Sequence, residues 1–442
     1  MMHPLPEAFL NNMQALLGDE YPAFLRALDA PAALALRLNP KRHGPEAAAA
    51  PYIDGPVPWC REGRYLISQI QDRPGSSIAH AAGAFYLQEA SAMASAAALD
   101  AMPGERVLDL CAAPGGKSTQ IAAALDGRGL LVSNDPEPAR AQALAGNLER
   151  MGVANAVVTC ALPVRLAERW PERFDAILVD APCSGEGMFR RDPAARDEWN
   201  PGAPKGCARR QAEILDQAAR MVRPGGRLVY STCTFNAVEN EGSVLGFLDR
   251  HPDFVPEDFE LPGVGPSHSG MLRLFPHRLR GDGHFVARLR RMGEGSPDKT
   301  SSSRPDRAVA AIVDALERDV CRLDIVDGMS FSRQGEWLYA RPLDCPGLDG
   351  LRVINSGLCL ARLGRSHIEP AHALAMAIDP DCARRRFELD ETAARAWLRG
   401  EPVPCNGEKG WTLALYRDMP LGWGKVSDGM LKNHLPKGLR RS

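Results

Sequence analysis

Five short apolar segments recur between residues 106 and 231, separated by stretches with helical spacing. The intervals between them are long enough for the crossover connections that parallel neighbouring strands require. The pattern therefore predicts an α/β fold, with a parallel sheet and helices on both faces. A later segment, HFVARLR, is expected to complete the sheet. The five segments are RVLDL, GLLVSN, NAVVTC, FDAILVD and GRLVYS.

Composition and charge narrow the class of protein. Of the 442 residues, 45% are apolar and 24% are charged, which excludes a wholly disordered, collagenous or coiled-coil chain. The 53 Lys and Arg nearly balance the 55 Asp and Glu, so any nucleic-acid binding must come from local basic patches. The eleven cysteines include no C-x-x-C pair, which favours a reducing compartment over disulfides or zinc. With neither a long apolar run nor a signal peptide, we expect a cytoplasmic protein without a membrane span.

The chain divides where its composition changes. Residues 1–85 begin with helical spacing and continue through a proline-rich stretch, and residues 86–292 hold the strand and helix alternation. Residues 293–307, GEGSPDKTSSSRPDR, are polar with almost nothing to bury, which is typical of a linker. Beyond the linker we expect two small α+β units, at residues 308–375 and 376–442.

A glycine-rich turn follows the first predicted strand. In CAAPGGK, residues 111–117, the small side chains let a ligand approach backbone amides at the start of a helix. The segment matches neither the dinucleotide-binding pattern nor the P-loop pattern. Asp135 closes the second strand, where a carboxylate can accept both hydroxyls of a ribose. The alternative is a tight structural turn beside an unrelated surface acid.

Two cysteines and an acid follow the fourth and fifth strands. Asp180 and Cys183 lie in DAPCSG and Cys233 lies in STC, so all three should face one crevice at the carboxyl edge of the sheet. A buried free cysteine is more often a packing residue, and as thiols Cys111 and Cys160 are interpreted in that way. Cys183 and Cys233 differ because they stand beyond strand ends in glycine- or threonine-rich turns.

Cytosine is a base that such thiols could activate. A thiolate that adds to C6 makes C5 nucleophilic enough to accept a methyl group. Asp180 could bind N3 and the exocyclic amine, if protonated or sharing a proton with the base, and Lys117 could reach the same base or carboxylate. A second thiol could assist breakdown of the adduct. The target base must be unpaired or extruded for this attack.

These residues stand in segments that resemble the Nop/Sun family of RNA 5-methylcytosine methyltransferases, in particular its bacterial RsmF-type members, which act on 16S ribosomal RNA. Three short motifs carry the resemblance in chain order, and further segments extend it over nearly the whole chain. The matching segments are CAAPGGK, DAPCSG, STC with Glu239 to Glu241 after it, FYLQEASAM, RRDP, PLGWGK and KNHLPKGLR.

The resemblance implies a Rossmann-like class I methyltransferase sheet that uses S-adenosylmethionine, a helical RNA-binding lead-in and a small PUA-like RNA-binding C-terminal module. It implies that Cys233 is the nucleophile, that Cys183 is needed for product release and that Asp180 contacts the base. Lys117 completes the expected catalytic set, and no metal is expected. Expected cofactor contacts are Cys111, Ala112, Ala113, Pro114, Gly115, Gly116, Lys117, Asp135 and Asp180.

The chain departs from the family pattern after the third strand. Members of the family usually offer a polar or acidic side chain to the adenine there, whereas this chain has Cys160, Ala161 and Leu162. The adenine amine must then meet backbone or another residue, and no side chain is assigned to it.

The expected partner is ribosomal RNA or the small ribosomal subunit, bound by a monomer. Positive charge supplies affinity for RNA phosphates but little sequence choice. Phe85 and Tyr86 are candidates for stacking on an unpaired base, although an aromatic side chain in such a segment is more often part of the core. The basic residues expected to hold phosphates are Arg190, Arg191, Arg196, Arg209 and Arg210, with Arg37, Lys41 and the basic C-terminal tail extending the track.

Two alternatives remain open at this point. The catalytic motifs do not exclude the same chemistry on transfer RNA, although the C-terminal module, which resembles that of the ribosomal RNA enzymes, favours ribosomal RNA. A non-catalytic RNA-binding factor in ribosome assembly would keep the fold without methyl transfer, although intact Cys233, Cys183, Asp180 and Lys117 speak against it.

Overall fold

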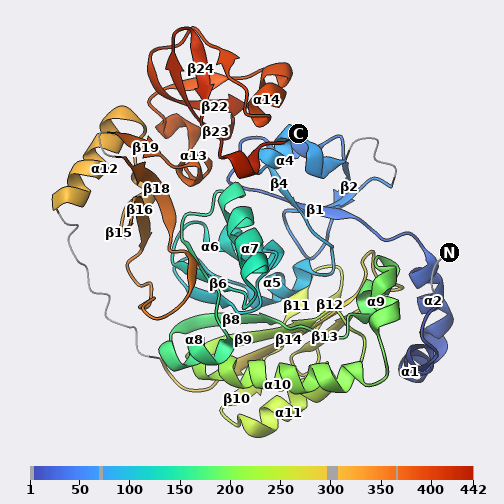
Figure 1. Cartoon of the computed structure of the whole chain (residues 1–442). Helices are drawn as coiled ribbons and strands as arrows, with labels where there is room; N and C mark the ends of the chain where they lie inside the picture. The colour runs from blue at the N-terminus through green and yellow to red at the C-terminus, as the bar shows by residue number, and fades with distance from the viewer. Residues whose placement is uncertain (1–3, 69–72, 296–306, 365–366, 442) are drawn as a thin grey trace.

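A computed structural model describes residues 4–68, 73–295, 307–364 and 367–441 (Figure 1). Its largest sheet has the strand order β10-β14-β9-β8-β5-β6-β7-β17, with β13 also paired to β14. The five strands from β9 to β7 in this order run parallel, and they are the five segments that the sequence predicts, so the predicted fold class is confirmed. Their bounds are β5 Arg106–Asp109, β6 Leu130–Asn134, β7 Ala156–Thr159, β8 Phe174–Asp180 and β9 Val222–Thr232.

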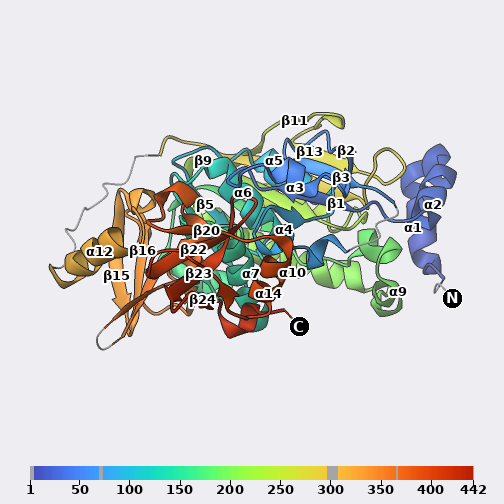
Figure 2. The ribbon, with the colours of Figure 1, turned by 90° about the horizontal axis from the view of Figure 1, so that it is seen from above.

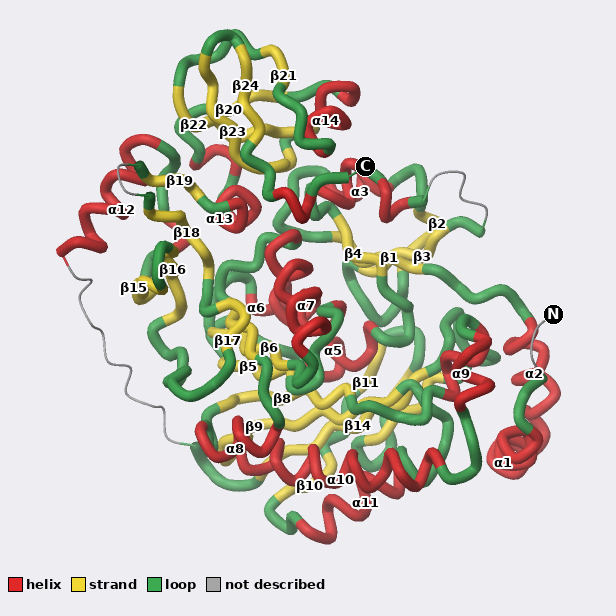
Figure 3. Tube along the Cα trace, viewed as in Figure 1, coloured by secondary structure: helices red, strands yellow, loops and turns green. Residues whose placement is uncertain are grey.

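Helices cover both faces of this sheet (Figures 1 and 3). On one face lie α5 (Met93–Leu99), α6 (Gly116–Leu125) and α7 (Pro138–Arg150). On the other lie α8 (Pro163–Arg169), α10 (Ala203–Met221) and α11 (Glu241–Arg250). The buried residues of α7 are Ala141, Leu144, Ala145 and Leu148, an apolar stripe at the spacing of one helix face. Burial of such stripes against the apolar strands forms the core.

The sheet continues beyond β9 with an antiparallel strand. β14 (His284–Arg291) pairs with β9 so that Phe285 lies opposite Thr232. The first residue of β14 therefore lies at the edge where the parallel strands end. Around it lie β10 (Phe254–Pro256), β13 (Met271–Leu274) and the hairpin of β11 (Glu260–Leu261) and β12 (Gly265–Pro266).

A strand from the second half of the chain closes the opposite edge. β17 (Val353–Asn355) runs antiparallel to β7, with Val353 opposite Thr159. The sequence pattern does not predict this pairing, since β17 is only three residues long and lies nearly 200 residues further along the chain. The large sheet is thus shared between residues before and after the polar segment 293–307.

The N-terminal lead-in is helical only at its start. It begins with α1 (Glu7–Leu17) and α2 (Tyr21–Asp29), followed by a four-stranded sheet that the sequence analysis does not predict. The sheet has the order β2-β3-β1-β4, and two short helices flank it. The bounds are β1 Ala35–Leu38, α3 Pro45–Ala49, β2 Ile53–Pro56, β3 Gly63–Leu66, α4 Ile78–Ala81 and β4 Phe85–Leu87.

The two N-terminal helices pack against turns of the large sheet. Phe9 contacts Phe189 edge to face, with ring centroids 5.0 Å apart, and Phe24 contacts Phe235 at 5.2 Å. Phe189 follows β8, just before α9 (Pro193–Glu198), and Phe235 follows β9. The lead-in therefore supports the two turns in which the sequence places the candidate cysteines.

Two further sheets follow the polar segment, of which residues 296–306 lie outside the described residues. Their strand orders are β15-β16-β18-β19 and β20-β22-β23-β24-β21. In Figure 2, α12 lies at the opposite end of the molecule from α1 and α2. The predicted domain boundaries stay a prediction. The bounds are α12 Arg307–Asp319, β15 Met329–Gln334, β16 Trp337–Pro342, β18 Leu358–Leu363, β19 Ile368–Pro370, α13 His372–Ala377, β20 Arg386–Glu388, α14 Glu391–Leu398, β21 Val403–Pro404, β22 Gly410–Tyr416, β23 Met419–Ser427 and β24 Met430–Asn433.

Across the described ranges, no helix combines the length and the apolar character needed to cross a membrane.

The core of the large sheet can be tested with a matched pair of leucines. Leu178 is fully buried in β8, whereas Leu245 on α11 is 56% exposed. Leu178→Ala should lower the free energy of unfolding by about 2–5 kcal/mol because it leaves a cavity. Leu245→Ala should change it by about 0.5 kcal/mol or less. Urea unfolding followed by tryptophan fluorescence measures both, and equal effects would contradict the observed packing.

Candidate active site

Asp180 ends β8 at the carboxyl edge of the sheet, where open α/β sheets bind their ligands. Lys117, the second residue of α6, donates from Nζ to Asp180 Oδ2 over 2.7 Å. Ser231 Oγ, from the neighbouring strand β9, donates to Asp180 Oδ1 over 2.8 Å. The Asp180 side chain remains 29% exposed. The carboxylate is therefore held by two neighbouring elements and still open to solvent.

His284 is a third partner of this carboxylate, and the sequence analysis misses it. Its Nε2 lies 3.5 Å from Asp180 Oδ1, and its side chain is only 3% exposed. The signal that could have found it is its place as the first residue of a predicted strand. An antiparallel strand begins at the edge where its parallel neighbours end, so His284 reaches the site that Asp180 occupies.

The charges of this cluster determine the state of Asp180. Burial alone would raise the pKa of Asp180, but the charge of Lys117 and the contact with His284 outweigh it and hold the pKa well below its usual range. Burial alone would lower the pKa of Lys117, but the charge of Asp180 outweighs it and the pKa is raised. Asp180 is therefore ionised and Lys117 is cationic at neutral pH.

Cys183 and Cys233 lie side by side. Cys233 directly follows β9 and Cys183 lies three residues beyond β8, and their Sγ atoms are 3.3 Å apart. The hydrogen bond with Cys233, together with burial, raises the pKa of Cys183 well above its usual range. Cys183 is consequently a neutral thiol at physiological pH.

Glu239 ties the two cysteine turns together. It is fully buried, and its Oε2 accepts from the amide of Ser184 and from Nε2 of Gln211, each over 2.9 Å. A second link is backbone to backbone, because the amide of Gly187 donates to the Cys233 carbonyl over 2.8 Å. Turns joined in this way hold the two thiols in one arrangement, which favours catalysis by preorganisation.

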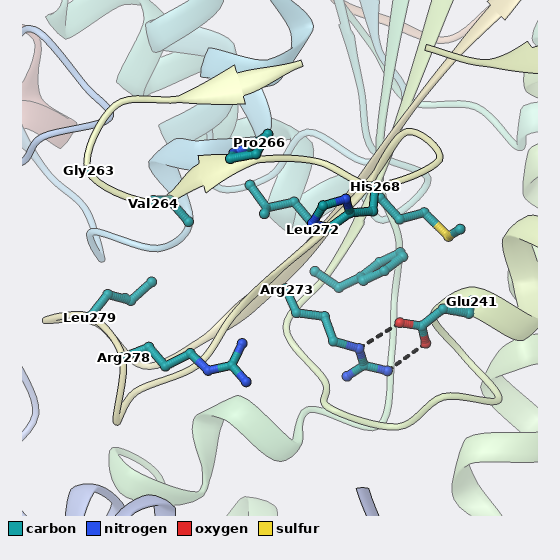
Figure 4. A pocket seen from close by; sticks show the side chains of 11 residues that line it. Glu241, Gly263, Val264, Pro266, His268, Leu272, Arg273, Arg278 and Leu279 are labelled. Atoms are coloured by element: carbon teal, nitrogen blue, oxygen red, sulfur yellow. Dashed lines mark hydrogen bonds and ion pairs between the residues drawn. The ribbon is translucent and has the colours of Figure 1, made fainter. Parts of the chain in front are cut away.

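A cavity of about 480 Å³ lies beside the Cys233 turn and is shown in Figure 4. Arg273 in its wall pairs with both carboxylate oxygens of Glu241, the closer contact being 2.5 Å, and donates to the Phe235 carbonyl over 2.8 Å. Arg278 in the same wall pairs with Glu20 of the lead-in. Because both guanidinium groups already have carboxylate partners, we assign them a structural role. Arg273 thereby anchors the chain two residues beyond Cys233.

The glycine turn adopts a conformation that needs its glycines. Gly115 has a φ of 112°, in the region that side chains disfavour. A Cβ at Gly116 would lie 3.3 Å from atoms of both Tyr86 and Gln88. Asn147 of α7 stabilises the turn, because its Nδ2 donates to the Pro114 carbonyl over 2.9 Å. The backbone here is thus shaped for close approach of a ligand.

Two buried acids flank this turn. Asp109 at the end of β5 accepts from Ser118 Oγ over 2.7 Å, while its Oδ1 is buried without a hydrogen-bond partner in the described part of the chain. Burial raises the pKa of Asp109 to about 7. Asp135 accepts from the amide of Glu137 over 3.0 Å and lies 3.3 Å from Arg140 Nη2. Both acids stand at carboxyl ends of strands, as a ligand site requires.

The structure also describes the segment that departs from the family pattern. The Cys160 amide donates to the Arg352 carbonyl over 2.8 Å, and the Ala161 amide donates to Asn134 Oδ1 over 3.1 Å. Backbone donors at this position are therefore engaged within the protein. Arg352 precedes β17, so residues beyond the polar segment reach this end of the site.

Much of the expected RNA track is wrong. Arg190 and Arg191 both pair with the buried Asp282, and Arg196 is buried with its Nε donating to the Phe189 carbonyl. These three arginines organise the turn after β8 and are not available to phosphates. Arg209 and Arg210 are exposed on α10, and their role stays a prediction.

Three other residues that the sequence suggests as RNA contacts are also buried. Arg37 is fully buried and its Nη2 donates to the Gly116 carbonyl over 3.3 Å, so it supports the glycine turn instead of binding RNA. Phe85 is fully buried and Tyr86 is 8% exposed, so both are core residues and not stacking platforms. The sequence pattern alone does not distinguish a buried structural residue from an exposed RNA contact, because basic and aromatic residues occur in both roles.

Full-length relatives identify this chain. The ribosomal RNA small subunit methyltransferase F of Erwinia tasmaniensis is 34% identical to it over 99% of this chain and 97% of its own length. The chain belongs to the RsmB/F family of 16S rRNA methyltransferases. The proteins of the same name from Escherichia coli and Vibrio cholerae are 34% and 31% identical and cover 99% and 100% of this chain, and 96% and 99% of their own lengths.

Family models match the chain from end to end. The model of the 16S rRNA methyltransferase RsmB/F matches residues 96–290, and the RsmF N-terminal domain matches residues 5–90. The first C-terminal domain of the RsmF rRNA methyltransferase matches residues 317–378, and the RsmF PUA domain matches residues 384–441. The resemblance to the RsmF-type Nop/Sun enzymes and the PUA-like C-terminal module are thus confirmed.

Solved structures agree on the fold. A methyltransferase homolog protein from Pyrococcus horikoshii is 28% identical, covers 65% of this chain and 95% of its own, and superposes with a TM-score of 0.57. NSun6 from the same organism is 21% identical, covers 65% of this chain and 99% of its own, and has a TM-score of 0.58. The second likeness shows the fold alone.

This chain is an S-adenosylmethionine-dependent rRNA (cytosine-C5) methyltransferase of the RsmB/F family, and the site fits that cofactor. The glycine turn can receive a ligand against its backbone, and Asp109 at the end of the preceding strand has a buried Oδ1 with no hydrogen-bond partner among the described residues. Asp135 supplies the carboxylate expected to meet a ribose. The structure also brings Lys117, Asp180, Cys183 and Cys233 to one edge of the sheet, while the role of each stays a prediction.

The depressed pKa of Asp180 predicts a pH-dependent stability. Asp180→Asn leaves the Lys117 ammonium without its carboxylate, which should cost about 3 kcal/mol at pH 7. Because the pKa is lower in the folded protein, ionised Asp180 stabilises the fold above its unfolded pKa of about 4, and this contribution is lost as pH falls further. The difference in unfolding free energy between wild type and variant should therefore narrow from pH 7 to about pH 3. Asp249→Asn, at an exposed position on α11, is the control, and a gap independent of pH would contradict the assignment.

Proposed function

We propose that this RsmB/F-family enzyme methylates C5 of a 16S rRNA cytosine through a covalent bond between Cys233 and C6 of the base. The observation that carries the proposal is the meeting of two thiols, an ionised acid and a lysine at one sheet edge. Cys233 and Cys183 are 3.3 Å apart, and Lys117 is 2.7 Å from Asp180. Nucleophilic catalysis of this kind splits one difficult substitution into addition and elimination.

Asp180 orients and activates the base. As a carboxylate it accepts from the exocyclic amine of cytosine and favours the form of the ring that carries a proton at N3. This proton makes C6 more electrophilic, and it arrives with the base from solvent. Lys117 and His284 keep Asp180 ionised for this role, and Ser231 fixes the direction of the carboxylate.

Addition and release use the two thiols in turn. The Cys233 thiol first loses its proton to water. Its thiolate sulfur then bonds to C6 as the electron pair of the C5–C6 double bond moves into the ring, and the ring becomes neutral because N3 already holds a proton. After C5 accepts the methyl group, its proton passes to water, the C5–C6 double bond forms again, and the bond from sulfur to C6 breaks so that Cys233 leaves as a thiolate. We assign Cys183 to this release, because it lies against the sulfur that departs.

S-adenosylmethionine supplies a methyl group on a sulfonium, which is electrophilic enough for the activated C5 to take. The residues proposed to hold this cofactor are Cys111, Ala112, Ala113, Pro114, Gly115, Gly116, Lys117, Asp135 and Asp180.

We further propose that the enzyme acts as a monomer in the cytoplasm, on ribosomal RNA or the small subunit. The test is transfer of labelled methyl from S-adenosylmethionine to purified 30S subunits, naked 16S RNA and transfer RNA. Label in ribosomal RNA cytosine supports the proposal. Label only in transfer RNA would overturn the substrate, and no label in any sample would favour a non-catalytic assembly factor.

Cys233→Ala should abolish methyl transfer, because no other group forms the bond to C6, while cofactor affinity stays nearly unchanged. Labelled methyl transfer and equilibrium dialysis with S-adenosylmethionine measure the two quantities. Cys382→Ala, in the C-terminal half of the chain, is the matched control and should keep full activity. Normal methylation by Cys233→Ala would remove the nucleophile assignment.

Cys183→Ala should trap the enzyme covalently on its RNA, because addition proceeds and release fails. A denaturing gel of enzyme, 16S RNA and S-adenosylmethionine should show a slowly migrating band. The double variant Cys183→Ala/Cys233→Ala should lack this band. If the single variant turns over without an adduct, Cys183 has no role in release.

A further inference from the structure

A second cavity, of about 800 Å³, lies where all four matched parts of the chain meet. Its walls come from α7, from β16 and α13, and from the segment that follows β24 up to Arg441. Figure 1 shows the C-terminal segment beside α4 and above α7, with β16 and β18 to one side. The cavity is distinct from the site described above, because its lining includes no residue of the glycine turn or of the two cysteine turns.

Arginines gather at this cavity without acidic partners. Arg150 and Arg441 line it, and Arg42 lies behind Arg150, donating from Nη2 to the Arg150 carbonyl over 3.3 Å. Arg150 donates to the carbonyls of His80 and Phe85, each over 3.1 Å. In the described part of the chain none of the three arginines has a carboxylate partner. Backbone carbonyls satisfy their hydrogen bonds but cannot neutralise their charge.

The C-terminal arginine is built into this arrangement. Arg441 Nη1 donates to the carbonyls of Ser76 and Ser77, over 2.7 and 2.9 Å. The basic tail predicted to contact RNA therefore folds back onto the N-terminal part of the protein and places its cation at the cavity wall. Lys437 and Arg440 lie in the same C-terminal segment and are exposed.

Burial, and to a lesser extent the charges of neighbouring arginines, lowers the pKa values of these cations. Burial, and after it the charge of Arg150, lowers the pKa of Arg42 to about 10, and burial lowers the pKa of Arg150 to about 10 as well. The carboxyl group in the wall compensates only in part, because burial raises the pKa of Glu149 to about 7 and leaves it incompletely ionised at neutral pH. His372, also in the wall, has its pKa lowered to about 4 by burial and is neutral. Among the described groups that line the cavity, positive charge therefore exceeds negative charge at neutral pH.

An aromatic side chain lies on the wall that β16 forms. Trp337 is 37% exposed, and Tyr339 lies two residues further on the same strand. Arg362 lies over the Trp337 ring at 5.8 Å and pairs with Glu336. Cations on one wall and an exposed indole on another match a nucleotide, whose phosphate needs charge and whose base stacks on aromatic rings.

We propose that this cavity is a second RNA-binding site, in which a backbone phosphate of 16S rRNA lies against Arg150 and Arg441 and an unpaired base stacks on Trp337. The proposal rests on the RNA substrate of the proposed function. The N-terminal, methyltransferase and C-terminal parts would hold the RNA jointly, so their relative placement becomes part of substrate recognition.

The charge contact predicts a change in salt dependence. Binding of full-length 16S rRNA is measured by filter retention between 50 and 300 mM KCl, a range of about sixfold in salt. Arg441→Gln should reduce the slope of log affinity against log salt by about 0.7 to 1, the effect of one lost phosphate contact. Arg441→Lys should keep the wild-type slope, because it keeps the charge.

The stacking contact predicts a different signature. Trp337→Ala should weaken binding by about tenfold with the salt slope unchanged, and Trp337→Phe should recover most of the loss. Arg165→Gln, an exposed position on α8, is the control for removal of a surface charge and should leave both slope and affinity near wild type. Equilibrium binding of S-adenosylmethionine, which must stay unchanged, confirms that the variants are folded.

The outcomes separate this site from the proposed function. Unchanged slope in Arg441→Gln together with unchanged affinity in Trp337→Ala would overturn the second site, even if the wild-type enzyme methylates 16S RNA. Equal effects in Arg165→Gln would also overturn it, because they would show general charge attraction only. A wild-type enzyme that binds 16S RNA with the predicted differences but transfers no methyl would keep the site and overturn the chemistry.

Discussion

The ion pair between Lys117 and Asp180 is the interaction around which the site is built. Taking both charges out of water is costly, and a pair of this kind is weak evidence for a gain in stability. Its value is chemical, because a cation 2.7 Å away keeps Asp180 ionised at the open edge of the sheet. The partners come from the turn after β5 and from the end of β8, so the pair forms only when these strands lie side by side.

The remaining parts of the site serve to hold two turns in one arrangement. Glu239 bridges the turns after β8 and β9, and Arg273 anchors the second of them through the Phe235 carbonyl. The phenylalanines of α1 and α2 pack against the same turns from outside. A 3.3 Å contact between two thiols needs this support, because surface turns without it are mobile.

The second half of the chain is integrated into the methyltransferase part rather than attached to it. β17 extends the large sheet, and the Arg352 carbonyl accepts a hydrogen bond from the Cys160 amide. Arg441 donates to the carbonyls of Ser76 and Ser77, just before α4. These contacts join segments that lie hundreds of residues apart in the chain. Residues on both sides of the polar segment 293–307 therefore contribute to one sheet.

The arginines show where inference from the sequence fails. Arg37, Arg190, Arg191 and Arg196 look like an RNA track, because a basic residue near a catalytic motif suggests phosphate binding. Arg37 and Arg196 are instead buried and donate to backbone carbonyls, and Arg190 and Arg191 pair with the buried Asp282. The hydrogen-bonding capacity of arginine suits both tasks, and only the positions of its neighbours decide between them.

The sequence by itself determined the parallel sheet, the glycine turn, and the placement of Asp180, Cys183 and Cys233 at strand ends. These features are local, because alternation of apolar strands and helices sets the edge at which each strand ends. Only the tertiary structure decided that β14 runs antiparallel and brings His284 to Asp180, that β17 joins the sheet, and that Arg42, Arg150 and Arg441 gather near one cavity. Those features depend on contacts between segments that are far apart in the chain, and the local sequence pattern of one segment does not indicate which distant segment it will contact.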